Sequence, residues 1–324
     1  MVRKIRAISA ILCIISILLG GGFFVAHFAK KNSEAKIVVT AYAIYDIVTN
    51  IMGDNDDVVL LSSGTDLHSY EPTPADIKTI SSSQLFISVG GESWVDKTLA
   101  RVDNPSMIQV CLMDSVELIS SNSDGIIDDD HNAHDHNHAH DHNHDHSDYD
   151  EHIWLSINNM ITMAEIVYDN LILAYPHMQT IYKTNYDNYI GELKDLEREY
   201  SKALIGKVTP IVVADRFPFV YLTHDYNINY YAAFSGCSTE TDVSFDMIMQ
   251  LIDKVNSTDV DYIFILENSS NRSIAERVRS GSNKGQSLQI LELNSCQSIY
   301  VDENTSYISI MLDNLENLKK AIKV

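Results

Sequence analysis

The chain has 324 residues, enough for two domains of ordinary size, and its 45% hydrophobic and 21% charged residues are typical of folded proteins. Its formal net charge of −22 argues against binding to nucleic acid, which needs clustered lysine and arginine. The acidic excess is uneven, because residues 124–151 contain ten Asp and Glu residues and no Lys or Arg. This composition is compatible with a cationic ligand.

The N-terminus contains an apolar run, residues 7–29, that carries no charge over 23 residues. Three basic residues precede it and two lysines close it. The length suits a bilayer span, and the leading basic side is the one expected to stay in the cytoplasm. Because the run lacks a good small-residue cleavage site, residues 1–31 favour an uncleaved anchor over a removed signal peptide. Both alternatives make the remainder extracytoplasmic, either membrane-associated or, if residues 1–29 are cleaved, secreted.

Apolar strands alternate with amphipathic helices over residues 36–114. Expected strands are residues 36–42, 57–63, 85–91 and 108–114, and expected helices are residues 43–53, 74–83 and 93–102. Unbroken apolar strands separated by helices indicate a parallel sheet covered on both faces. We therefore expect an N-terminal α/β lobe over residues 36–175.

Residues 121–150 are polar and have no periodicity, which indicates a loop or disordered insertion in that lobe. A helical period follows over residues 157–175 and again over residues 178–204. The second helix, of about 27 residues, would be roughly 40 Å long. It suits a rigid linking helix, residues 177–205, between two lobes.

The alternation of strands and helices returns in residues 207–324, which predicts a C-terminal α/β lobe. Expected strands are residues 210–215, 230–236, 261–267 and 288–294, and expected helices are residues 217–227, 244–257, 273–281 and 306–324. The predicted fold class is therefore α/β, with two doubly wound lobes joined by a long helix. Ligands of such sheets bind near the carboxyl ends of the strands.

Three cysteines lie outside the apolar N-terminal run. Cys237 and Cys296 both follow strand-like runs of the C-terminal half, and in an oxidising compartment they could form a disulfide. The alternative is that these two and Cys111 are buried thiols.

A tract of 16 residues, 131–146, contains eight histidines interleaved with Asp and Asn. Neutral imidazole is a favoured ligand of zinc, copper and nickel. Ordering a flexible segment costs conformational entropy, so this auxiliary metal tract is expected to bind several ions loosely. Its histidines are His131, His134, His136, His138, His140, His142, His144 and His146.

A selective site needs ligands on structured elements, and two histidines satisfy this. His68 lies in a loop after a predicted strand, and His152 begins the structured segment "HIWLS" beside a strand-like apolar run. Each alone is more often an ordinary surface or core histidine. The tract inserted between them in the same lobe favours a shared metal site instead.

Three segments resemble the substrate-binding proteins of zinc and manganese ABC transporters, the metal-binding cluster of that class. "LHSYEPTPADI" is similar to the family's first ligand motif, "GGESWVDK" to its next segment, and "DEHIWLS" to the motif that carries its second ligand. Zinc-binding members commonly insert a His-rich loop just before the last motif, as here. The resemblance covers roughly residues 36–324 and implies that His68 and His152 ligate the metal.

The C-terminal half departs from the family pattern. Arg216 occupies the place of the third ligand, and arginine cannot bind a cation. The neighbouring Asp215 is the expected substitute, with pairing to Arg216 as the alternative. The fourth, usually acidic, ligand falls near the neutral Asn294 and Gln297, so Glu267 at the end of a strand is the other expected carboxylate ligand.

These features predict an extracytoplasmic, monomeric binding protein that captures a divalent transition metal. Imidazole ligands favour Zn²⁺ over Mn²⁺, although a manganese-type protein stays open. The resemblance implies delivery to an ABC importer, a membrane permease with its ATPase. A membrane-tethered buffer or sensor that uses only the tract is the alternative. An enzyme is not expected, since the sequence has no His-Glu-x-x-His, P-loop or Gly-x-Ser-x-Gly motif.

Overall fold

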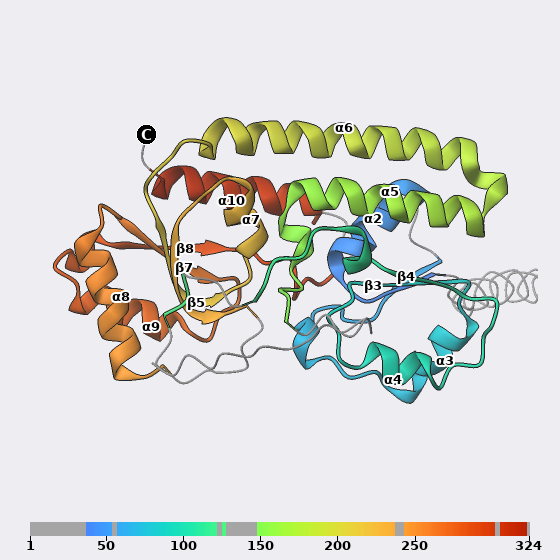
Figure 1. Ribbon diagram of the computed structural model, residues 1–324, viewed down its shortest axis with the longest axis horizontal. Helices are drawn as coiled ribbons and strands as arrows, with labels where there is room; N and C mark the ends of the chain where they lie inside the picture. Colours follow the sequence, from blue (N-terminus) through green and yellow to red (C-terminus); the bar gives the residue numbers. More distant parts are fainter. Residues whose placement is uncertain are drawn as a thin grey trace, which may run out of the picture.

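The computed structural model describes residues 37–53, 57–121, 125–127, 148–236, 243–301 and 305–322. Two α/β lobes lie side by side, and the long helix α6 (Gln179–Leu204) runs across both of them (Figure 1). The expected anchor, residues 1–31, and the histidine tract, residues 131–146, lie outside the described residues. Within the described ranges, none of the helices combines the length and apolar character that crossing a membrane requires.

The first lobe contains a parallel sheet with the strand order β2-β1-β3-β4. Its strands are β1 (Ile37–Val39), β2 (Val58–Leu60), β3 (Leu85–Ser88) and β4 (Ile108–Cys111). Helices α3 (Pro74–Ser82) and α4 (Val95–Leu99) lie on one face, and α2 (Tyr42–Met52) and α5 (Ile157–Ala174) on the other (Figure 1). Successive residues of a strand face opposite sides of the sheet. Val39 and Ile87 belong to one core cluster, and Val38 and Phe86 belong to another. Burial on both faces accounts for the unbroken apolar strands.

The second lobe repeats this plan with the order β6-β5-β7-β8, also parallel. Its strands are β5 (Ile211–Phe217), β6 (Tyr230–Ser235), β7 (Tyr262–Leu266) and β8 (Gln289–Leu293). Its helices are α7 (Val220–Asp225), α8 (Phe245–Ser257), α9 (Arg272–Gly281) and α10 (Tyr307–Ala321). One short segment of the polar insertion joins this lobe, since Ile126 forms a parallel bridge with Ala232 of β6.

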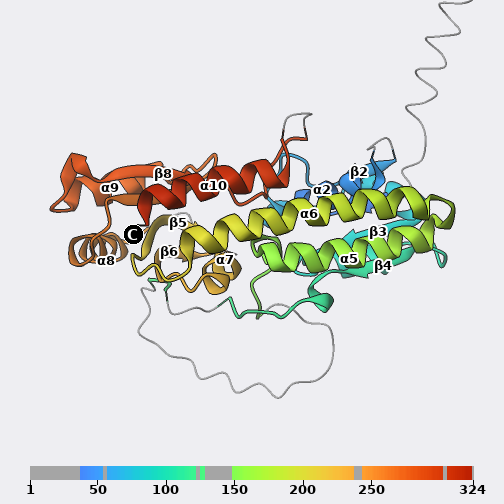
Figure 2. The same ribbon diagram turned by 90° about the horizontal axis from the view of Figure 1, so that it is seen from above.

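Helix α6 connects the lobes through buried tyrosines. The Tyr189 hydroxyl donates to Asp46 Oδ2 of α2 at 2.7 Å, and the Tyr200 hydroxyl donates to the Met311 carbonyl of α10 at 2.6 Å. Seen from above, α6 lies along α5 at one end and along α10 at the other (Figure 2). The prediction of two α/β lobes joined by a long helix is confirmed.

Several predicted elements differ from the structure in type or length; helix α7, for example, spans Val220–Asp225 and not the predicted residues 217–227. The apolar run Ile153–Leu155, which looks strand-like in sequence, is a short 3-10 helix, here η3. All three residues are buried, so the run has no polar alternation to distinguish a strand from a helical turn. Helix α4 spans only Val95–Leu99, shorter than the predicted residues 93–102.

Candidate metal centre

His68 is held on a turn of 3-10 helix, η1 (Leu67–Ser69), in the first lobe. The Asp66 side chain caps this turn by accepting the backbone N–H of His68 at 3.0 Å. After η1 the chain is extended until α3 begins at Pro74, where Thr73 and Asp76 form a capping box. A capped turn followed by a capped helix fixes the backbone on both sides of the histidine.

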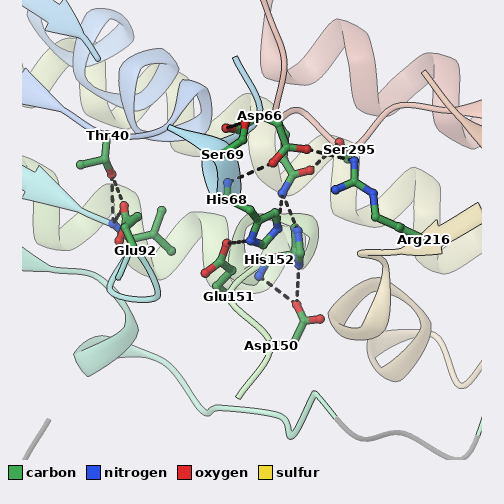
Figure 3. A network of polar contacts seen from close by, with 12 residues as sticks. Thr40, Asp66, His68, Ser69, Glu92, Asp150, Glu151, His152, Arg216 and Ser295 are labelled. Carbon is green, nitrogen blue, oxygen red and sulfur yellow. Dashed lines mark hydrogen bonds and ion pairs between the residues drawn. The ribbon is translucent and has the colours of Figure 1, made fainter. Parts of the chain in front are cut away.

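His152 is fully buried at the start of η3, directly before α5. Asp150 fixes it twice, because Asp150 Oδ1 accepts the His152 backbone N–H at 2.9 Å and lies 2.8 Å from its Nδ1. The ring centroids of His68 and His152 are 5.4 Å apart. Two histidines that are 84 positions apart in the chain therefore face one another (Figure 3).

Both imidazoles present Nε2 to the same point. His68 Nδ1 lies 2.9 Å from Oε1 of Glu151, and His152 Nδ1 faces Asp150, so a carboxylate stands behind each ring. A proton on each Nδ1 leaves each Nε2 with a free lone pair. The Gln297 amide nitrogen from the second lobe lies 3.2 Å from Nε2 of His68 and 2.6 Å from Nε2 of His152. An imidazole that carries its proton on Nδ1 is the tautomer that binds a metal through Nε2.

Glu151 is the acidic member of this group. One potential ligand atom from each of His68, Glu151 and His152 lies within 4.8 Å of the others, and we call these three residues the two-histidine centre. Glu151 is buried, and its Oε1 lies 2.9 Å from Nδ1 of His68. A buried carboxylate beside two imidazoles favours the binding of a cation.

The charges of the centre are coupled. Burial alone would raise the pKa of Glu151, but the adjacent His68 and His152 outweigh this and lower it. Burial alone would lower the pKa of His68, but Glu151 and Asp66 outweigh it and hold the pKa above the ordinary 6.5. Glu151 therefore stays ionised and supplies negative charge to the centre.

Gly91 makes room for Glu151. A Cβ atom at position 91 would lie 2.2 Å from Oε2 of Glu151, far inside van der Waals contact. The turn that carries Gly91 is tied by the Glu92 side chain, which accepts the backbone N–H of Val89 at 3.0 Å and of Gly90 at 2.7 Å. The "GGES" segment thus permits the close approach of this carboxylate to the first lobe.

The two carboxylates expected from the second lobe are not brought into the centre. Asp215 is buried at the end of β5 and accepts N–H groups from Arg216, Leu266 and Asn271 at 2.9, 3.1 and 2.9 Å. Glu267 accepts both the backbone N–H and the hydroxyl of Ser295, at 2.9 and 2.6 Å. Their oxygens stabilise the second lobe.

The neighbouring positions also have defined partners. Arg216 forms an ion pair with Asp66, and Asn294 accepts the Cys296 backbone N–H through its side chain. Cys296 is a buried free thiol in the structure, and its expected partner Cys237 lies outside the described residues. His224, the histidine on α7 of the second lobe, is exposed.

Sequence reasoning missed Glu151, and it placed Gln297 near the fourth-ligand position without predicting its contact with both imidazoles. Glu151 could have been identified because it directly precedes His152, and the apolar "IWL" that follows indicates that this segment is buried. For Gln297 no sequence signal marks the direction of the amide, because that depends on how the second lobe packs against the first.

Comparisons with known proteins agree on one family. The family model for zinc-uptake complex component A, periplasmic (ZnuA), matches residues 37–321. The zinc-binding lipoprotein AdcA of Streptococcus pneumoniae R6 is 28% identical over 323 residues, which cover 98% of this chain and 61% of AdcA. The metal ABC transporter substrate-binding lipoprotein SsaB of Streptococcus sanguinis is 24% identical, with 91% of each chain covered. The chain therefore spans about three fifths of the length of AdcA.

Solved structures share the fold. The Zn(II)-bound ZnuA-like domain of Streptococcus pneumoniae AdcA superposes with a TM-score of 0.68 at 24% identity, over 89% of this chain and 99% of that domain. The periplasmic zinc-binding protein TroA from Treponema pallidum gives a TM-score of 0.69 at 18% identity, over 88% and 98% of the two chains. With a family model that matches nearly all of the described residues and the same two-lobe fold, the chain belongs to the zinc-uptake complex component A (ZnuA) family.

Proposed function

We propose that the chain captures Zn²⁺ at the two-histidine centre and delivers it to an ABC importer. The observation that carries this proposal is the convergence of His68, Glu151 and His152, whose potential ligand atoms lie within 4.8 Å of one another. Two imidazoles with one carboxylate suit zinc better than manganese, which prefers oxygen ligands. Zinc is the cargo here, so it must be held selectively and then released.

Each residue of the centre has a distinct part in holding the ion. His68 and His152 offer Nε2, and Asp150 behind His152 fixes the orientation of its ring. Glu151, which lies behind Nδ1 of His68, fixes that ring and neutralises part of the positive charge. The Gln297 amide nitrogen must leave its present position when the ion enters, because an N–H donor cannot ligate a cation. Turning the amide would direct its carbonyl oxygen to the same point.

Names of the relatives support the delivery step and the location. SsaB is named a metal ABC transporter substrate-binding lipoprotein, and AdcA a zinc-binding lipoprotein. We therefore propose an extracytoplasmic, membrane-associated protein that docks as a monomer on a permease driven by an ATPase. The described part of the chain would be the zinc-binding portion, with the histidine tract collecting ions loosely.

Deleting residues 131–146 is expected to leave one tight zinc site, because the two-histidine centre lies wholly outside the tract. The measurement is a competitive titration with a zinc chelator on the chain with and without the deletion. Loose additional binding should disappear and the tight site should remain. If the deletion abolished all zinc binding, the protein would instead be a buffer that uses only the tract.

Zinc affinity is expected to fall as the pH drops through the raised pKa of His68. Zinc binds only neutral imidazole, so protons compete with it. Because the folded protein holds the pKa of His68 above 6.5, the loss should begin at a higher pH than for an unperturbed histidine. The check is the same titration at a series of pH values on the chain without the tract. An affinity that stays constant down to pH 6.5 would contradict this expectation.

A further inference from the structure

The loop that carries His68 is bound to the second lobe by an ion pair. Arg216, near the end of β5, donates from Nη2 to Oδ2 of Asp66 at 2.9 Å (Figure 3). The other carboxylate oxygen of Asp66 accepts the backbone N–H of His68 at 3.0 Å. One carboxylate therefore joins Arg216 of the second lobe to the backbone of a candidate metal ligand in the first lobe.

Arg216 itself is firmly placed. Its backbone N–H donates to Asp215 Oδ1, and Asp215 is fixed in turn by Leu266 and Asn271. The side chains of Arg216 and Asp66 are only 28% and 22% exposed. The ion pair is therefore partly shielded from solvent.

Two more contacts hold the same loop against the second lobe. The backbone N–H of Gly64 donates to the Ile299 carbonyl at 3.0 Å. The Tyr300 ring lies against Gly64, where a Cβ atom would come within 2.2 Å of the ring. Gly64 also has a φ of +68°, which favours glycine. The loop before His68 is thus fastened at Gly64 and at Asp66, both times to the second lobe.

We propose that Arg216 is a positioning residue, which acts through Asp66 to hold His68 in its metal-binding orientation before the ion arrives. This inference rests on the proposed zinc site. Arg216 of the second lobe occupies a place where a metal ligand was expected. Its guanidinium group forms an ion pair with the loop that carries His68, the candidate ligand of the first lobe. Residues that orient metal ligands commonly change affinity by about 10–100-fold when they are replaced.

The sign of the Arg216→Met effect separates this role from a simple charge effect. Removing a positive charge close to a divalent cation should tighten binding if Arg216 only repels the ion. If Arg216 positions His68, the same variant should bind zinc about tenfold more weakly. Asp66→Asn should weaken binding to a similar extent. The amide oxygen can still accept the His68 N–H, but the negative charge that pairs with Arg216 is lost.

The experiment is a chelator-competition titration of zinc on the 324-residue chain, with enough chelator to remove loosely bound ions. Arg216→Met, Asp66→Asn and the double variant should all be weakened alike, because the two residues act as one unit. Arg216→Lys, which keeps the charge, should recover most of the affinity. Arg272→Met is the matched control, because Arg272 pairs with Glu292 inside the second lobe at 3.6 Å, and it should bind as the unaltered chain does.

Thermal unfolding of the metal-free variants checks that each one folds. If Arg216→Met does not fold, the zinc affinities of Asp66→Asn and Arg216→Lys test the proposal in its place. Unchanged or tighter binding by Arg216→Met, or additive losses in the double variant, would overturn the positioning role. Absence of any tight site in the unaltered chain would instead overturn the proposed function.

Discussion

Replacing His152 by alanine is expected to lower the affinity of the tight zinc site more than a hundredfold, beyond the roughly 10–100-fold typical of residues that only orient a ligand. His152 is fully buried, it offers Nε2 to the common point, and Asp150 fixes its ring. The variant would leave Asp150 with no imidazole to orient and the centre with one histidine. Chelator competition on the chain without residues 131–146 measures the loss.

Three further variants serve as controls. His224→Ala removes an exposed histidine of the second lobe, and it should leave zinc affinity unchanged. Asp215→Asn and Glu267→Gln test the carboxylates that were expected from sequence, and neither should remove the tight site, because their oxygens accept hydrogen bonds within the second lobe. A loss with either one as large as with His152→Ala would show that the lobes rearrange to bring that carboxylate to the ion.

The sequence predicted the fold well because burial dictates it. Parallel strands covered on both faces must be apolar throughout, and the helices between them must be amphipathic, so the alternation of elements is readable directly. The long helix was equally clear from its period, and the structure begins and ends it at Gln179 and Leu204. The run Ile153–Leu155 was misread as strand-like, since three consecutive buried residues carry no period.

The candidate centre was only partly readable. His68 and His152 stand at junctions between loops and elements, where the sequence motifs draw attention to them. The sequence places Asp215 at the end of a strand but does not give the direction of its side chain. In the structure Asp215 turns toward N–H groups of Leu266 and Asn271. Such buried donors need an acceptor, and satisfying them takes the carboxylate away from the candidate centre.

Glu151 was overlooked for a related reason. Carboxylates were sought on the second lobe, where the family pattern has them, whereas the structure places a buried carboxylate of the first lobe, Glu151, beside the two histidines. Its approach depends on Gly91, which is distant in sequence and has a role that only the packing reveals. First-lobe residues therefore supply all three members of the centre, and Gln297 is the second lobe's contact with both imidazoles.

Replacing Gln297 by glutamate is expected to tighten zinc binding at least about tenfold, or roughly 1.4 kcal/mol. The Gln297 side chain already reaches both Nε2 atoms, at 3.2 and 2.6 Å. A carboxylate there would give the ion a charged ligand in addition to the two imidazoles and make the centre more closed, as structural zinc sites are. It would also replace an N–H donor, which must move aside, with an acceptor that can stay in place.

The matched control is Gln289→Glu, which adds the same charge on an exposed position of β8 and should leave zinc affinity unchanged. Chelator competition gives the affinity, and stopped-flow transfer to the chelator gives the release rate, which should fall with Gln297→Glu. If the ion were bound elsewhere, the two glutamates would behave alike. Slower release would also hinder delivery, so a neutral amide at this position agrees with the proposed transfer of zinc to an importer.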